Sequence, residues 1–297
     1  MKKYYLFVVT LLLVILASLA LFYYRNSIFD FYDKTTESLS QISKTDLGSV
    51  VTQLKKEVFT PSPLNIGGQE NEVEFTKEKI IAQTNVQRYN NGGLLPVVEN
   101  SKLDAAALAK AQDMFSKQYF EHVSPLGVGP GDLVKSFGYD YIVVGENLIL
   151  GNFGSEKEIV QAWMDSPGHR ANILNDRVTE IGVAIIKGTY EGRTVWIGVQ
   201  EFGLHISACQ QTDSSLKNQI DTNKAKLDQL STGLDNKRAE IDGTNPKSPK
   251  YNKLIDEYNE MVKEYNELVQ TTKNLITQYN NEINVFNQCV QGTSVIQ

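Results

Sequence analysis

The fold is decided by one stretch of the chain, residues 162–174, which reads AWMDSPGHRANIL. It continues a helical pattern that begins at Glu156, and the sequence Ser166-Pro167-Gly168 stops that helix. A histidine, His169, comes directly after the break. We therefore expect His169 to lie in a loop, and the alternative is that His169-Arg170 begins another helix.

Patterns on both sides of this stretch predict a mixed α and β domain over residues 75–208. Helical spacing extends over residues 76–89 and 101–117, with Asn100 or Ser101 as the N-cap of the second helix. Residues 181–186 and 194–202 are strand-like and β-branched, and Glu191-Gly192 between them is typical of a hairpin turn. Helices together with an antiparallel strand pair predict an α+β fold, arranged as an α/β/α layered domain.

Three side chains of this domain are candidate ligands for Zn²⁺: His122, Glu146 and His169. Neutral imidazole and carboxylate groups suit zinc, and three protein ligands leave an open coordination position. A water molecule bound there has a lowered pKa, which would permit hydrolysis. Structural roles are the alternative. His122 would then cap a helix end, Glu146 would accept backbone N–H bonds in a tight loop, and His169-Arg170 would only pair with a carboxylate.

Five motifs occur in order along the domain. They are His122-Val123-Ser124-Pro125, Gly145-Glu146-Asn147-Leu148, Trp163 to Leu174, Ile181-Gly182-Val183-Ala184, and Val199-Gln200-Glu201-Phe202-Gly203. In this order they resemble the CAP superfamily (cysteine-rich secretory, antigen 5 and pathogenesis-related-1 proteins) in its bacterial SCP-like form. The resemblance extends from Phe75 to about His205 and implies an α/β/α sandwich with a broad open cleft.

The resemblance also implies roles for single residues. In the eukaryotic members of the family the cleft holds two His and two acidic residues, and some members bind Zn²⁺ there. By motif, His122 and His169 match the two histidines and Glu146 matches one acid. The second acid usually lies three residues after the Trp, where this chain has Ser166. Asp165 lies one residue earlier, so it is the candidate fourth ligand, and the candidate base if the protein is a hydrolase.

The N-terminus predicts export. Residues 4–24 contain no charged residue, Pro or Gly, and they are long enough to cross a membrane as a helix. Lys2 and Lys3 precede this run, which favours a cytoplasmic N-terminus and an extracytoplasmic remainder. The alternative is a signal peptide cut after Ala20, which would give a secreted protein. Residues 1–25 are therefore a transmembrane anchor or signal, and residues 26–74 are a stalk or linker with no chemistry of its own.

Two heptad arms at the C-terminus predict an antiparallel coiled-coil hairpin over residues 209–291, followed by a tail at 292–297. Apolar positions are spaced alternately by four and three along residues 216–241 and again along 254–286, and residues 243–247 break the helix. In antiparallel register, paired residue numbers have a nearly constant sum. This rule pairs Leu230 with Leu268 and Cys209 with Cys289, so we expect a disulfide there. Two unrelated free thiols are the alternative.

The second arm of the hairpin also has a widened apolar stripe, which includes Ile255, Val262 and Val269. Two helices alone bury little core, so this stripe suggests a further partner for the hairpin. The candidates are the globular domain, another copy of the chain, or a protein of the cell envelope.

Net charge and missing motifs narrow the classes of function that the chain can have. The chain of 297 residues has a formal net charge of −6, so no basic excess points to nucleic acid. No strand–Ser–helix elbow, P-loop or dinucleotide fingerprint occurs. Our first hypothesis is a membrane-anchored extracytoplasmic binding module whose His/Glu cleft holds a small ligand or a divalent metal, with Zn²⁺ as the candidate cofactor. The alternatives are a zinc-dependent hydrolase acting at the cell envelope, and a structural scaffold that works through its hairpin.

Overall fold

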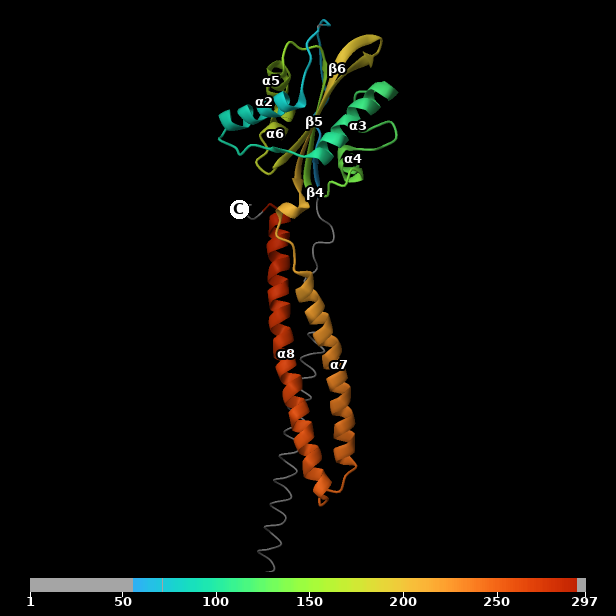
Figure 1. The fold of residues 1–297 in the computed structure, drawn as a ribbon, viewed down its shortest axis with the longest axis vertical. Coiled ribbons are helices and arrows are strands. Elements are labelled where there is room, and N and C mark those ends of the chain that lie inside the picture. The colour runs from blue at the N-terminus through green and yellow to red at the C-terminus, as the bar shows by residue number, and fades with distance from the viewer. Residues whose placement is uncertain (1–55, 71, 293–297) are drawn as a thin grey trace, which may run out of the picture. The chain divides into compact units, whose positions relative to one another are not determined.

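The computed structural model describes residues 56–70 and 72–292 (Figure 1). These residues divide into two compact units, one formed by residues 56–210 with 287–292 and the other by residues 211–286. The anchor predicted at residues 4–24, the linker up to residue 55 and the tail after residue 292 lie outside the described residues. Within the described part of the chain, each helix is either too short or too polar to cross a membrane.

The first unit is built on a mixed six-stranded sheet, in which five strands run in the order β1-β4-β6-β5-β3 and β2 also pairs with β4. The strands are β1 (Glu57–Phe59), β2 (Leu64–Gly67), β3 (Val98–Glu99), β4 (Tyr141–Gly151), β5 (Glu180–Tyr190) and β6 (Arg193–His205). The hairpin turn predicted between the last two strands is present. Its two residues, Glu191 and Gly192, have φ angles of 47° and 76°, as the tight turn of a twisted hairpin requires.

Helices cover both faces of this sheet, so the unit has three layers (Figure 1). One layer contains α2 (Lys77–Asn90), α5 (Glu156–Asp165) and α6 (Pro167–Ile173), and the other contains α3 (Ser101–Lys117) and α4 (Pro130–Ser136). Asn100 is the N-cap of α3, and its side chain accepts a hydrogen bond from the Lys102 N–H. Small residues let α3 approach the sheet closely. A Cβ at Gly182 of β5 would lie 2.1 Å from the Leu103 carbonyl carbon of α3, so that position requires glycine.

The alternative that places Glu146 of the Gly145-Glu146-Asn147-Leu148 motif in a tight loop is wrong. These residues lie in β4, and all eleven residues of that strand are buried. A strand that is covered on both faces lacks the alternation of polar and apolar residues that identifies a half-exposed strand, so periodicity could not find it.

The part of the predicted linker nearest the domain also differs from expectation. Residues 57–67 contribute β1 and β2, which pair in parallel with β4 at one edge of the sheet. Each strand is only three or four residues long. Such short strands are stabilised by the edge of an existing sheet, and they leave almost no local signal in the sequence.

The second unit is an antiparallel pair of long helices, α7 (Ser214–Asp242) and the part of α8 (Pro249–Val290) up to Phe286. Leu227, Leu234 and Ile241 of α7 form one buried cluster with residues 254–269 of α8. Leu216 and Ile220 form another cluster with Tyr279 and Ile283. Many of the buried positions are ones that the heptad pattern predicts, but the predicted Leu230, Met261, Leu268 and Leu275 are only partly buried, and Val262, Val269 and Ile283 of the neighbouring stripe are buried.

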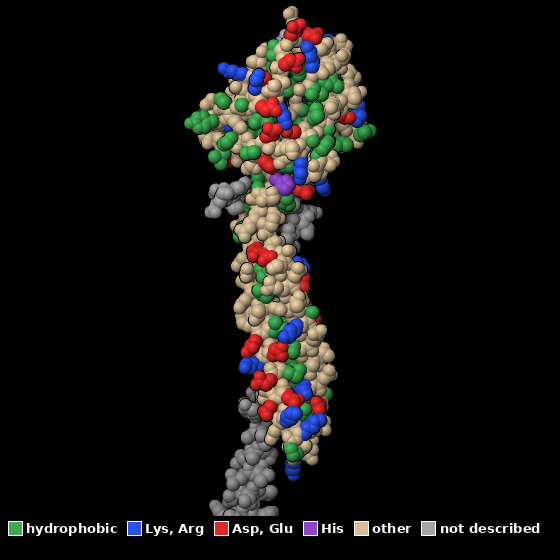
Figure 2. Space-filling model, viewed as in Figure 1, with side chains coloured by type: hydrophobic (Ala, Val, Ile, Leu, Met, Phe, Trp, Pro, Cys, Tyr) green, Lys and Arg blue, Asp and Glu red, His purple; other side chains and the backbone are tan. Residues whose placement is uncertain are grey.

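The apolar stripe of α8 is used inside this helical pair. Val262 and Val269 are buried in the larger cluster, and Ile255 packs against it. The outer surface carries Lys and Glu side chains (Figure 2), with ion pairs between the two helices such as Lys226–Glu264 at 2.7 Å and Lys237–Glu257 at 2.8 Å. The stripe therefore gives no argument for a further partner, which stays a prediction.

The predicted disulfide between Cys209 and Cys289 is confirmed. Both cysteines are buried, and their Cα atoms lie 5.7 Å apart. Cys209 follows the short helix η1 (Ile206–Ala208) at the end of β6, and Cys289 lies in the last turn of α8. The bond closes a loop across a sequence separation of 80 residues, which is worth about 4 kcal/mol in the chain-entropy account.

Candidate functional site

The site begins with a pair of carboxylates on neighbouring strands. Glu146 of β4 is directly opposite Glu201 of β6 in the antiparallel register. Residues that are opposite one another in such a pair extend their side chains to the same face of the sheet. Both glutamates are completely buried, so two carboxyl groups share one enclosed space.

The two carboxyl groups disfavour each other's ionised form. Burial raises the pKa of Glu201 well above its ordinary value, and the nearby Glu146 raises that pKa further, while Lys110 opposes the shift. Two buried carboxylates this close favour the protonated form of one of them. Neither Glu201 oxygen has a hydrogen-bond partner in the described part of the chain.

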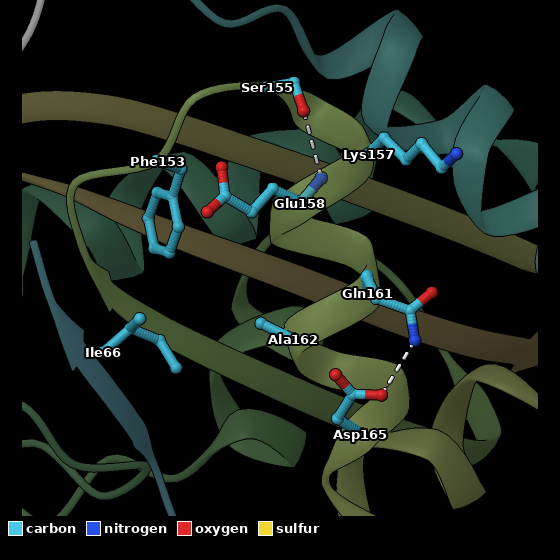
Figure 3. Close-up of a pocket in the computed structure, with 8 residues that line it drawn as sticks. All are labelled: Ile66, Phe153, Ser155, Lys157, Glu158, Gln161, Ala162 and Asp165. Carbon is cyan, nitrogen blue, oxygen red and sulfur yellow. Dashed lines mark hydrogen bonds between the residues drawn. The ribbon is translucent and has the colours of Figure 1, made fainter.

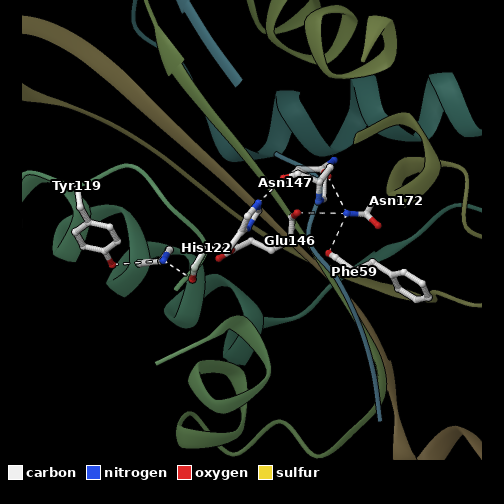
Figure 4. A network of polar contacts seen from close by, with 8 residues as sticks. Phe59, Tyr119, His122, Glu146, Asn147 and Asn172 are labelled. Atoms are coloured by element: carbon white, nitrogen blue, oxygen red, sulfur yellow. Dashed lines mark hydrogen bonds and ion pairs between the residues drawn. The ribbon is translucent and has the colours of Figure 1, made fainter. Parts of the chain in front are cut away.

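His122 contacts this carboxyl pair through Glu146. It lies in the loop between α3 and α4, and its Nδ1 is 2.5 Å from Glu146 Oε1 (Figure 4). Its Nε2 bonds the carbonyl oxygen of Pro61. Because a carbonyl oxygen only accepts, Nε2 carries a hydrogen, and a second proton must lie between Nδ1 and Glu146.

Lys110 of α3 holds the His122 loop in place. Its buried ammonium group donates to the His122 carbonyl oxygen at 2.7 Å and to the Tyr119 hydroxyl at 3.4 Å (Figure 4). Burial lowers the pKa of Lys110, while the charges of Glu146 and Glu201 act in the opposite direction. Lys110 therefore supplies positive charge near the acidic pair and fixes the backbone that carries His122.

His169 approaches the same region from the other helical layer. It lies in the first turn of α6, so the alternative that His169-Arg170 begins a helix is correct. Burial, together with a smaller contribution from the charge of His122, lowers the pKa of His169 to about 4, so the ring is neutral at pH 7. Its Nδ1 is 2.8 Å from Ser166 Oγ. Its buried Nε2 has no hydrogen-bond partner in the described part of the chain.

Two asparagines join α6 to β4 beside the histidine. Asn172 donates to Asn147 Oδ1 at 2.9 Å and to the Glu146 carbonyl oxygen at 3.3 Å. Asn147 donates to the His169 carbonyl oxygen at 3.2 Å. These bonds fix α6, the element that carries His169, to the strand that carries Glu146 (Figure 4).

Asp165 is placed elsewhere. It is the last residue of α5, and its Oδ1 accepts a hydrogen bond from Gln161 at 2.8 Å. It lines a shallow pocket on the outer side of α5 together with residues such as Phe153 and Glu158 (Figure 3). The second carboxyl group of the buried site is Glu201, which lies in one of the five motifs but is not among the ligands predicted from the sequence.

The arrangement does not form a ready metal site. In the described residues, no group of three or more His, Cys, Asp and Glu side chains is arranged to hold a metal ion. The reason is visible in the contacts. Both nitrogens of His122 are engaged, by Glu146 and by Pro61. The expected ligand set of His122, Glu146 and His169 therefore does not fit zinc in this conformation.

A comparison with protein families identifies the domain. Residues 81–202 match the model of the cysteine-rich secretory protein family, CAP. These residues form a CAP domain. The match confirms the family that the five sequence motifs resemble.

Known proteins similar to the chain match it over about half of its length. The uncharacterized protein YkwD of Bacillus subtilis is 38% identical over 163 residues, which is 55% of this chain and 58% of that protein. The uncharacterized membrane protein YlbC of the same organism is 28% identical over 166 residues, which is 54% of this chain and 47% of that protein. The chain thus spans about half the length of these curated relatives.

Solved structures resemble the chain over a similar fraction. A crystal structure of an extracellular protein containing an SCP domain from Bacillus anthracis is 26% identical, with a TM-score of 0.35, over 42% of this chain and 39% of that one. An outer surface protein of Borrelia burgdorferi is 21% identical, with a TM-score of 0.40, over 46% of this chain and 99% of that one.

Proposed function

We propose that this protein is an extracytoplasmic CAP-domain binding module, held at the cell membrane through residues 4–24. The hydrophobic N-terminal run supports the membrane link, and so does the name of one relative, a membrane protein. A buried structural disulfide between Cys209 and Cys289 supports an oxidising compartment outside the cytoplasm.

The observation that carries a binding function, rather than a catalytic one, is the state of the polar groups around Glu146. Both nitrogens of His122 have partners, and His169 has a pKa of about 4, far from the value that suits a general base at neutral pH. Those two partners are a carboxylate and a carbonyl oxygen, so in the described residues no Ser, Thr or Cys nucleophile is activated by the His122 ring. The unpartnered Nε2 of His169 is instead a group that a ligand can satisfy.

The hairpin at residues 209–291 completes the proposal. Its apolar side chains are used inside the helical pair, so it contacts a protein or envelope partner through polar and charged side chains. In this proposal the CAP domain binds the ligand and the hairpin supplies a second, independent contact surface.

The test measures location and turnover on the full-length chain. Protease added to intact cells should digest the CAP domain, and the protein purified in detergent should not hydrolyse fluorogenic peptides or nitrophenyl esters, with or without zinc. A matched Glu146→Gln variant is the control for turnover. Zinc-dependent hydrolysis that Glu146→Gln abolishes would replace the binding module by the zinc-dependent hydrolase, and full protection of the domain in intact cells would overturn the location.

A further inference from the structure

The sheet edge beside the buried site has a gap in its pairing. β1 pairs with residues Val143 to Gly145 of β4, and β2 pairs with residues Ile149 to Gly151. Between them, residues 146–148 of β4 have no strand partner on this edge among the residues that the structure describes. The chain segment that crosses the gap is Thr60-Pro61-Ser62-Pro63. We call residues 57–67 the strap.

Two prolines explain why the strap leaves the sheet at this point. Proline has no backbone N–H, so it cannot continue a hydrogen-bonded ladder. The carbonyl oxygen of Pro61 turns instead to the Nε2 of His122. A second backbone carbonyl, that of Phe59, accepts from Asn172 Nδ2 at 3.3 Å. Two side chains that bond the main chain of the strap, those of His122 and Asn172, are therefore site residues.

The room for Pro61 comes from a glycine. A Cβ added at Gly168, the residue before His169, would lie 2.6 Å from the Pro61 Cβ, closer than real Cβ atoms approach another atom. The Ser166-Pro167-Gly168-His169 turn thus leaves a space that the Pro61 ring fills. The CAP domain presents a shaped position for a proline ring beside a donor for its carbonyl oxygen.

The strap is held mostly through its main chain, which pairs with β4 on both sides of the gap. Three of its apolar side chains are exposed, with exposed fractions of 41% for Val58, 40% for Phe59 and 47% for Ile66. One of its own side chains, that of Glu57, forms an ion pair with Arg177 at 2.9 Å. With the strap in place, His169 Nε2 still lacks a partner in the described residues. The strap thus contributes little apolar burial and leaves the site incompletely satisfied.

From these contacts we propose that the cleft is a receptor for an extended, proline-containing peptide, and that the strap occupies it as a displaceable internal ligand. The proposal rests on the proposed binding function and names its ligand class. A peptide from another protein would add to the edge of β4 as a strand, and its main-chain carbonyl oxygens would bond His122 and Asn172. This is strand addition, in which main-chain bonds give affinity and side-chain pockets give selectivity.

Competition with the strap should weaken the binding of a free peptide by an amount that can be estimated. A tethered segment has an effective concentration of about a millimolar, so an external peptide must compete with it. We therefore expect weak binding to the wild-type chain, and binding at least about a hundredfold tighter when residues 57–66 are replaced by a Gly-Ser segment of equal length.

The experiment uses a fluorescent peptide with the sequence of residues 56–68, KEVFTPSPLNIGG, and the full-length chain in detergent. Fluorescence anisotropy should show tight binding to the strap-replaced chain and weak binding to wild type. In the strap-replaced chain, Gly168→Val should abolish binding because its side chain fills the proline position, and Val86→Ala, an exposed change on α2, should leave binding unchanged. Absence of binding to a folded strap-replaced chain would overturn the proposal.

A second variant of the full-length chain keeps the test valid if the strap-replaced chain does not fold. A specific protease site is placed at residues 69–72, after the strap, so that cutting leaves the strap bound without its covalent link. The labelled peptide should then exchange into the cleft, and failure to exchange would also overturn the proposal. Mass spectrometry of the recovered peptide separates the two proposals. Cleavage that Glu146→Gln abolishes would contradict the binding function, whereas an intact peptide that does not bind would contradict only the ligand class.

Discussion

The two units of the molecule bury different kinds of side chain. The hairpin excludes water from leucine, isoleucine, valine and tyrosine side chains, and Thr272 is its one buried polar residue among those the structure describes. The CAP unit buries ten polar or charged residues, including Arg88, Lys110, Glu146, His169 and Glu201. Burying such groups costs free energy unless each is paired. The comparison teaches that the hairpin is built for stability, whereas the CAP unit gives up stability to hold a polar site.

The largest expected effect is on the hairpin. Leu234→Asp places a charge at a fully buried position of α7 and should destabilise the hairpin by about 5 kcal/mol, because it loses a leucine side chain and buries a carboxylate. Both tryptophans, Trp163 and Trp196, lie in the CAP unit. Circular dichroism should therefore show loss of helix while the tryptophan unfolding transition persists.

The control for this variant is Asn236→Asp, which adds the same charge at an exposed position two residues away. It should change neither signal. If Leu234→Asp abolished the tryptophan transition as well, the two units would not unfold independently, and the comparison between them would fail.

The next effect is on the CAP unit. The guanidinium group of Arg88 is 2% exposed and donates to four carbonyl oxygens, those of Leu95, Ile173, Asn175 and Val178. Arg88→Met keeps the length of the side chain but removes every donor. It should destabilise the unit by about 4 kcal/mol, because buried acceptors lose their partners.

Denaturant unfolding followed by tryptophan fluorescence measures this change. Arg193→Met, at an exposed position of β6, is the matched control and should leave the midpoint unchanged. A wild-type midpoint for Arg88→Met would mean that water replaces the lost donors, and that the buried polar groups are less costly than we argue.

A smaller expected effect is a pH dependence of the unfolding free energy of the CAP unit. The pKa of Glu201 is raised in the folded state above its ordinary value of 4.5. The stabilisation that the protonated carboxyl gives to the folded state is therefore fully present below pH 4.5. The CAP unit then loses stability as the pH rises from there toward the raised pKa, by up to about 1.4 kcal/mol per pH unit. Glu201→Gln, which keeps a donor toward Glu146, should remove that dependence.

The measurement compares unfolding free energies of wild type and Glu201→Gln from about pH 5 to about pH 8, where the expected slope applies. Taking the difference between the two proteins cancels the contribution of His169, which has the opposite sign. Glu78→Gln, an exposed change on α2, should retain the wild-type slope. Parallel curves for wild type and Glu201→Gln would show that the carboxyl pair does not share a proton.

The smallest effect returns to the hairpin. Gly233 lies inside α7, and a Cβ there would meet only the terminal methyl group of Met261, at 2.9 Å. That group is the end of a flexible side chain, so it can move. Gly233→Ala should stabilise the hairpin by up to about 1 kcal/mol through helix propensity, measured as a later loss of the helical circular-dichroism signal. Destabilisation would indicate that the hairpin core is packed as tightly as the CAP core.

Sequence reasoning succeeded where a signal is local or repeats. The heptads predicted many of the buried positions of α7 and α8, constant register predicted the disulfide, and Glu191-Gly192 predicted the turn between β5 and β6. The order of the motifs predicted the family. Each of these features depends on neighbours in the chain or on a period that the chain itself displays.

Sequence reasoning failed where the deciding neighbour is distant. Glu201 belongs to the site because it is opposite Glu146 in the pairing of β4 with β6. No local sequence pattern shows which residues of two strands are opposite each other. Asp165 was selected for its distance from Trp163 in the chain, but the end of α5 places its carboxylate beside Gln161. The strap was interpreted as a linker because its prolines and short strands resemble one, and only the free edge of β4 makes it part of the sheet.

The disulfide has a mechanical consequence. The cysteines enclose both helices of the hairpin, so tension applied between the N-terminal side of the CAP unit and the C-terminus crosses the sulfur–sulfur bond and bypasses the 80-residue loop. A protease cut inside that loop would likewise release nothing, because both fragments stay joined to the CAP unit. The hairpin is therefore a covalently closed appendage that can be bent, cut or pulled by a partner without lengthening the path between the two ends of the chain.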